Sequence, residues 1–270
     1  GQEMVHAADW LWVADVDEFL NIHVGDHSIP ALIAACGDPQ AISVSFRFFA
    51  NAGVTRFEDR PVIGQFTRCH APDLWCGESA IEVKTLVRGD FPLQYYGAHR
   101  PFHKPNKAAA PVWKDGAGRD VPEAFLRAAN KRRIRKFPAK GARSFATLNH
   151  YALRSLDSYL VKNDRGDVNR ENREFDDSYW RERNDGACEE RSILRMLPKL
   201  EAQIAALKAL PGVAELHAEC VRLHRARRDA LVQQARYQAM QAQLRTASTL
   251  PPGEDELLAR IGAAPVLALP

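Results

Sequence analysis

The chain has 270 residues, of which 46% are hydrophobic and 26% are charged, a composition typical of a globular protein with a sizeable core. It has no apolar run near the roughly 20 residues that span a bilayer, and a net charge of +3 does not by itself call for a nucleic-acid partner. The five cysteines are scattered and form no Cys-x-x-Cys pair, which argues against a structural zinc site and favours a reducing compartment.

The first hundred residues have the pattern of an α/β or α+β protein. Residues 10–14 form a short apolar run that predicts a buried strand ending at Asp15-Val16-Asp17-Glu18. Ser28 is the predicted N-cap of a helix that runs to Ala35 and stops at Gly37. Three further segments read as strands: 41–49, 80–87 and 93–98.

The segment 100–144 is strongly basic. It contains thirteen lysines and arginines and three acidic residues, and its many prolines and glycines favour loop. We interpret it as an insert that binds an acceptor or an anionic membrane surface, the alternative being a solvated flexible segment.

The rest of the chain is mostly helical in pattern. Residues 145–150 predict a strand, and Ser155 predicts the start of a helix that ends near Gly166. Two helices follow, 189–208, which Pro198 should kink or split, and 213–244. We therefore expect a catalytic core over 1–170, a helical region over 171–247 for packing or oligomerisation, and a tail over 248–270.

Asp15 and Asp17 form an Asp-x-Asp motif next to an apolar strand. The two carboxylates are hard oxygen ligands, which suit a magnesium or manganese ion that keeps some waters and shares substrate phosphates. Such an ion neutralises a diphosphate and lets it leave. The alternative is a solvated turn or a helix N-cap.

The stretch from Trp12 to Leu20 resembles the Asp-x-Asp-Glu-Phe signature of family 2-type glycosyltransferases, which have a GT-A fold. Further segments are similar to that family, in its order, over residues 8–170. They are Ser45-Phe46-Arg47-Phe48-Phe49, Val83-Lys84-Thr85-Leu86-Val87-Arg88, Gly97-Ala98-His99-Arg100-Pro101 and Leu148-Asn149-His150-Tyr151, followed by Arg154-Ser155, Lys162 and Arg165-Gly166. The resemblance implies an α/β, GT-A-like core with a partial Rossmann-like mixed sheet and a C-terminal helical region.

Three features depart from the family. Its N-terminal βαβ segment, which holds the nucleotide, would precede the Asp-x-Asp motif, where this chain has fewer than fifteen residues. We therefore expect a fragment, weak or inactive by itself. Arg154 also stands where the family usually has lysine, and the basic insert after His99 is not a family hallmark.

The resemblance also implies roles for individual residues. Asp15 and Asp17 would hold Mn²⁺ or Mg²⁺ and the diphosphate of a nucleoside-diphosphate sugar, with His150 as the preferred further ligand and His99 as its rival. Five basic residues would bind the diphosphate: Lys84, Arg88, Arg154, Lys162 and Arg165. The base that deprotonates the acceptor would be Glu78, with Asp176 and Asp177 as alternatives. Each of these residues also has a purely structural alternative.

The expected function is metal-dependent, inverting transfer of a sugar to a glycan or lipid-linked hydroxyl acceptor in polysaccharide biosynthesis. We expect a cytoplasmic protein, with peripheral contact at the inner face of the membrane as an option, and no nucleic-acid partner. Two other classes compete with this interpretation. One is a HAD-like phosphatase with Asp15 as nucleophile and Asp17 as acid. The other is a non-enzymatic basic binding module built on residues 100–144 and 189–244.

Overall fold

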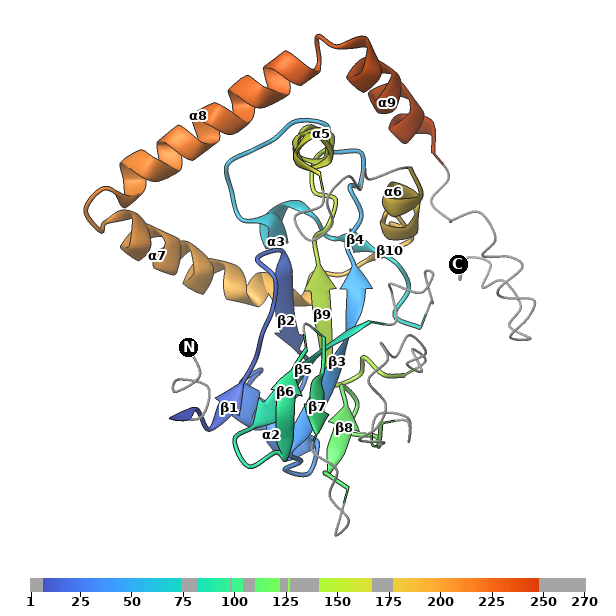
Figure 1. Cartoon of the computed structure of the whole chain (residues 1–270), viewed down its shortest axis with the longest axis vertical. Coiled ribbons are helices and arrows are strands. Elements are labelled where there is room, and N and C mark those ends of the chain that lie inside the picture. The colour runs from blue at the N-terminus through green and yellow to red at the C-terminus, as the bar shows by residue number, and fades with distance from the viewer. Residues whose placement is uncertain are drawn as a thin grey trace, which may run out of the picture. The chain divides into compact units, whose positions relative to one another are not determined.

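The structure is a computed structural model that describes residues 7–73, 82–97, 99–103, 110–121, 126, 141–166 and 177–247 (Figure 1). The chain is a mixed α/β protein that divides into two compact units, each built from separated segments. The first unit comprises residues 1–47 and 71–150, and the second comprises residues 48–70 and 151–270. This division differs from the predicted boundary near residue 170, because residues 48–70 join the C-terminal helices. The predicted tail, 248–270, lies outside the described residues.

The first unit is built on a six-stranded mixed sheet. Its strand order is β1–β5–β3–β9–β2, and β8 also pairs with β3. The β3–β8 pair is parallel, whereas β1–β5, β3–β5 and β2–β9 are antiparallel. The bounds are β1 (Trp10–Leu11), β2 (Glu18–Ile22), β3 (Ala41–Phe48), β5 (Val83–Arg88), β8 (Trp113–Asp115) and β9 (Ala146–His150). A separate hairpin joins β6 (Leu93–Tyr96) to β7 (Pro101–His103).

The predicted strand at 10–14 is corrected by the structure. Only Trp10–Leu11 is a strand, and the longer strand β2 begins at Glu18, where the sequence predicted the end of one. The reason is long-range pairing, since β2 forms a five-residue ladder with β9 that runs from Glu18 opposite His150 to Ile22 opposite Ala146. Asp15 and Asp17 therefore lie in the turn that leads into a strand.

Helix ends follow the predicted capping chemistry. Helix α2 (Ile29–Ala35) begins after Ser28, whose side chain accepts a hydrogen bond from the Ala31 N–H. Helix α5 (Leu156–Arg165) begins after Ser155 and ends at Gly166, whose φ of 78° suits glycine. Both helices are confirmed, as are strands β3, β6 and β9 within one or two residues of their predicted ends.

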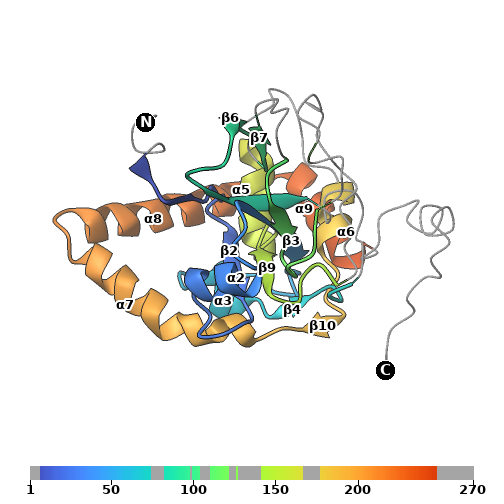
Figure 2. The ribbon, with the colours of Figure 1, turned by 90° about the horizontal axis from the view of Figure 1, so that it is seen from below.

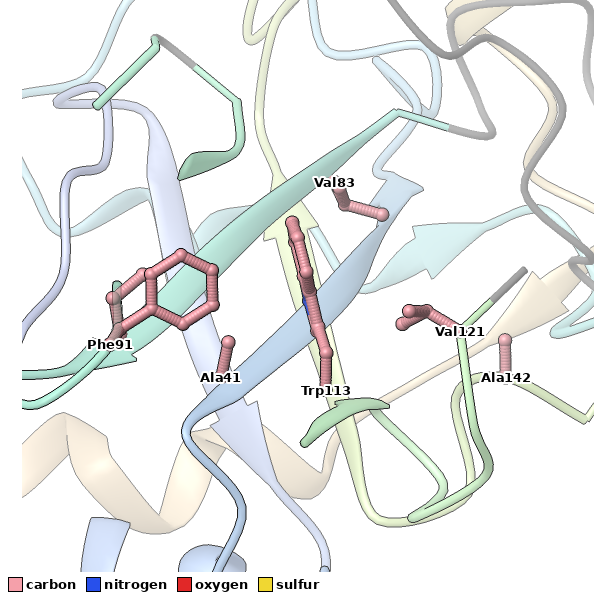
Figure 3. Close-up of a cluster of buried hydrophobic side chains, with 7 residues drawn as sticks. Ala41, Val83, Phe91, Trp113, Val121 and Ala142 are labelled. Carbon is pink, nitrogen blue, oxygen red and sulfur yellow. The ribbon is translucent and has the colours of Figure 1, made fainter. Parts of the chain in front are cut away.

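A buried hydrophobic cluster packs on strands β3, β5 and β8 of the sheet in the first unit (Figure 3). The Trp113 ring lies at its centre, with Phe91 and Ala41 on one side and Val121 on the other. Its indole N–H donates to the Ser43 hydroxyl at 2.9 Å, so the one polar atom of the ring is satisfied inside the core.

The second unit is mainly helical. Its helices are α3 (Val62–Gln65), α5, α6 (Asp177–Arg183), a 3₁₀ helix (Ser192–Met196), α7 (Leu197–Lys208), α8 (Val213–Leu231) and α9 (Ala235–Thr246), with a short sheet of β4 (Arg68–Cys69) and β10 (Cys188–Glu189).

The predicted helix 189–208 is split near Pro198, as expected, into the 3₁₀ helix Ser192–Met196 and α7. Pro198 lies in the first turn of α7, where a missing N–H costs nothing. The other long helix is corrected. The predicted helix 213–244 is two helices, broken between Leu231 and Ala235.

Helix α8 packs alongside α5 (Figure 2). Arg227 forms a bidentate ion pair with Asp164, with nitrogen–oxygen distances of 2.7 and 2.8 Å. Beneath it, Leu160, Leu231 and Tyr237 form a buried cluster. In the described part of the chain, no helix is both long enough and apolar enough to cross a membrane.

Candidate metal and diphosphate site

The Asp-x-Asp motif forms a tight turn that Glu18 closes. The Glu18 N–H donates to the Asp15 carbonyl oxygen at 3.1 Å, and the Asp15 N–H donates to Glu18 Oε2 at 2.9 Å. Val16 at the tip is 98% exposed. These reciprocal hydrogen bonds fix the turn and leave its two aspartates at the start of β2.

Lys84 reaches this turn from strand β5. Its Nζ lies 3.3 Å from Asp15 Oδ2 and 3.5 Å from Glu18 Oε2. The side chains of Lys84 and Glu18 are 3% and 1% exposed, whereas that of Asp15 is 68% exposed. One buried ammonium group is therefore shared between a buried carboxylate and one that faces water.

The carboxyl group of Glu18 has a perturbed pKa. Burial raises it from 4.5 to about 7, and the Asp15 N–H and the Lys84 ammonium offset only part of that effect. Glu18 is thus half-protonated near neutral pH, although it supports the turn of the predicted metal site.

His150 lies beside Asp17. The β2–β9 ladder places His150 opposite Glu18, and His150 Nε2 is 3.7 Å from Asp17 Oδ1. The Phe46 ring meets the imidazole in an edge contact, with 5.0 Å between ring centroids. Two ligand atoms each about 2.1 Å from one ion lie at most about 4.2 Å apart, so this separation is compatible with a shared ion.

The rival histidine has a different partner. His99 Nε2 lies 3.4 Å from Glu82 Oε2, and its ring centroid is 6.1 Å from that of Phe46. Of the two predicted ligands, His150 is therefore the one that the structure pairs with Asp17.

Arg88 takes no part in this cluster. It lies at the far end of β5 from Lys84 and forms a two-pronged pair with Asp90, with a further contact to Asp38. The side chains of Lys84 and Arg88 therefore serve different ion pairs, although the two residues share a strand.

The remaining predicted residues belong to the second unit or lie outside the described residues. Lys162 donates to the Ala152 carbonyl oxygen and to the Tyr179 hydroxyl, and Asp177 pairs with Arg181 one helical turn away. Arg165 is exposed in the last turn of α5, and Arg154 has a left-handed backbone with φ of 59°. Glu78 and Asp176 lie outside the described residues.

No protein-family model, no curated protein and no solved structure matches this chain. The strands and helices of the structure show the mixed α/β class. Because no comparison found a match, the GT-A resemblance stays a prediction from the sequence.

The available side chains limit which metal ion this site could bind. In the part of the chain that the structure describes, no three His, Cys, Asp or Glu side chains gather closely enough to hold an ion. Asp17 and His150 could supply two ligands, while the Asp15 carboxylate is held by Lys84. Two protein ligands fit an ion that keeps several waters and binds substrate phosphates, as magnesium and manganese do.

The sequence prediction missed the roles of Glu18 and Phe46. Glu18 holds the turn and Phe46 contacts both histidines. An acidic residue directly after Asp-x-Asp, with a lysine in a later strand, was the available signal for Glu18. Phe46 lies in one of the segments that resemble the family, but the sequence assigned it no role.

Proposed function

We propose that this chain carries the metal and diphosphate site of a metal-dependent, inverting glycosyltransferase. It would move a sugar from a nucleoside-diphosphate sugar to a hydroxyl group of a glycan or lipid-linked acceptor. The observation that carries the proposal is the pairing of Asp17 with His150 at the turn where Lys84 meets Asp15. Acidic, imidazole and ammonium groups together suit a metal–diphosphate ligand.

Each residue of the turn has a distinct proposed role. Asp17 and His150 would hold Mn²⁺ or Mg²⁺, which when bound supplies positive charge for the departing diphosphate. Lys84 orients the Asp15 carboxylate and adds a second positive charge beside it. The Glu18 carboxylate accepts a hydrogen bond from the Asp15 N–H and so positions Asp15. Its proposed role is to hold the turn, not to contact the substrate.

The acceptor hydroxyl must lose a proton during inverting transfer. Glu78 stays our proposed base on the sequence alone. Asp177 is less suitable, because its carboxylate is already paired with Arg181 in the same helix. Synthesis of a glycan from a nucleotide sugar also favours the cytoplasm, with peripheral contact at the membrane for a lipid-linked acceptor.

Calorimetric titration of the chain with UDP and with GDP, each with and without Mn²⁺, tests the proposal. We expect binding of at least one of them that requires Mn²⁺ and that Asp17→Ala abolishes. Asp120→Asn is the matched control, because Asp120 belongs to the same unit and its side chain is 82% exposed. Mn²⁺-independent binding, or equal binding by Asp17→Ala and wild type, would contradict the proposal.

The phosphatase alternative predicts a different activity. A HAD-like enzyme would hydrolyse p-nitrophenyl phosphate in the presence of Mg²⁺, and Asp15→Asn would abolish that hydrolysis. A glycosyltransferase would release no nitrophenol from this compound. The same protein sample therefore distinguishes the two enzyme classes.

A further inference from the structure

The second unit contains a pocket that the predicted chemistry does not use. It has a volume of about 190 Å³ and lies where helix α8 faces the start of α5 and the segment before α3. Six side chains line it: Arg56, Phe57, Asp157, His224, Arg225 and Arg228. Three arginines thus face one aspartate, so the lining carries excess positive charge.

The single acidic group of the pocket is already neutralised. Asp157 Oδ2 accepts a hydrogen bond from the Phe57 N–H at 3.1 Å and another from Arg228 Nη1 at 3.1 Å. The Asp157 side chain is 5% exposed, so this pairing is internal to the wall. Arg56 and Arg225 are left as the positive charges at the pocket mouth.

These two arginines are exposed, and within the described residues neither forms an ion pair with an acidic group. The Arg225 guanidinium lies 6.0 Å from the centroid of the Phe57 ring. An exposed arginine normally gains little from such a contact. Its donors remain available to an anion, for which the fork of the guanidinium is well suited.

Two buried nitrogen atoms add a second observation. His224 Nε2 and the Nε of nearby Arg154 are buried, and neither has a hydrogen-bond partner among the described residues. A buried polar atom without a partner calls for an explanation, and a bound ion is one such explanation. His224 also stacks obliquely on Phe57, with ring centroids 4.4 Å apart, which holds the imidazole in the wall.

The charge state of His224 agrees with an anion site. Burial lowers the pKa of His224, as do the charges of Arg154, Arg228 and Arg225, while Asp157 opposes them. The imidazole is therefore neutral near pH 7 in the free protein. A bound anion would reverse the sign of the local field and raise that pKa.

We propose that this pocket binds the phosphoryl group of a small molecule, with Arg56, Arg225 and His224 as the contacting residues. A water molecule takes roughly 30 Å³ in the liquid, so the pocket has room for a phosphate and part of an attached group. The Phe57 ring offers an apolar surface to that group. The site lies entirely in the second unit, so this proposal does not depend on the proposed glycosyl transfer.

The test is calorimetric titration of the full chain with inorganic phosphate and, separately, with glucose 6-phosphate. We expect saturable binding of at least one, weakened about tenfold or more in Arg56→Gln/Arg225→Gln, because the variant loses two charge-assisted contacts to the anion. The control is Lys199→Gln/Arg245→Gln, which removes two exposed positive charges of the second unit that do not line the pocket. It should leave the affinity unchanged within about twofold.

The outcomes separate the sources of the phosphoryl group. Tighter binding of glucose 6-phosphate identifies an ester, whereas tighter binding of inorganic phosphate identifies the free ion. A second readout is the pKa of His224 from histidine NMR, with the resonance identified by its loss in His224→Gln. We expect saturating phosphate to raise that pKa. No saturable binding of either compound, or equal weakening in the control, would overturn the proposal.

Discussion

Glu18 and Lys84 come from different strands, yet their charged atoms lie 3.5 Å apart in a place where both side chains are almost fully buried. A buried ion pair gains stability only when its geometry compensates for lost hydration. For Glu18 the effect of burial is larger than the attraction to Lys84, since its pKa rises to about 7 despite the lysine beside it. The turn that presents Asp15 and Asp17 therefore contains a proton-dependent support.

Replacement of Glu18 by glutamine should change how stability depends on pH. The unfolded carboxyl ionises near pH 4.5 and the folded one near pH 7, so between these values the folded state binds more protons. The wild-type free energy of unfolding therefore falls as pH rises through this window. The glutamine of Glu18→Gln cannot ionise. The free energy of unfolding of this variant should therefore rise relative to that of wild type, by on the order of 3 kcal/mol across the window.

Urea denaturation at several pH values from 4 to 8 measures this change. Glu215→Gln is the control, because Glu215 is exposed on α8. Its stability profile should run parallel to that of wild type. A Glu18→Gln profile that also runs parallel to wild type would contradict the assigned pKa.

Removal of Lys84 should have the opposite pH dependence. In Lys84→Met, the Glu18 carboxylate loses its only described buried cation, so ionisation becomes costlier. We expect a loss of about 3 kcal/mol at pH 8, and a much smaller loss at pH 5, where Glu18 is already protonated.

A double-mutant cycle isolates that pair. Glu18→Gln/Lys84→Met should recover much of the stability lost in Lys84→Met at pH 8, because no buried charge is left without a partner. Lys114→Met, which breaks a pair with exposed Asp120, serves as the control. Additive effects of the two substitutions at pH 8 would show that Glu18 and Lys84 do not interact.

Features set by neighbouring residues were predictable from the sequence. Ser28, Ser155 and Gly166 mark helix ends through local hydrogen bonding and backbone preference, and the structure confirms them. Strand β3 was predictable because Ile42, Val44, Phe46 and Phe48 alternate with serine and arginine residues, which is the period of a strand.

Features set by distant pairing were not predictable in the same way. Strand β2 was missed because buried Glu18 and Asn21 interrupt its apolar pattern. The approach of His150 to Asp17 depends on the register between β2 and β9, and that register is fixed by residues far apart in the chain. The resemblance therefore favoured His150 over His99, but only the strand register shows that His150 lies beside Asp17.

The choice between the two histidines can be measured directly. His150→Ala should weaken Mn²⁺ binding in the presence of the nucleotide by at least about tenfold, since even an outer partner of a metal ligand is worth about that much. His99→Ala should leave the affinity within about twofold of wild type, because His99 pairs with Glu82 instead. The Mn²⁺ affinities of both variants can be measured by titration followed by electron paramagnetic resonance of free Mn²⁺. A larger loss in His99→Ala would reverse the assignment.

The junction of α5 and α8 allows a comparison between charge and apolar packing. Leu231 is fully buried against Leu160 and Tyr237, whereas Arg227 is 53% exposed in its pair with Asp164. Leu231→Ala should therefore cost about 2–5 kcal/mol through lost burial and a cavity. Arg227→Ala should cost less than about 1 kcal/mol, because water competes for the ion pair. Urea denaturation measures both, and amide exchange in α5 shows whether the loss is local. If Arg227→Ala costs as much as Leu231→Ala, the ion pair contributes as much as the buried cluster to the stability of this junction.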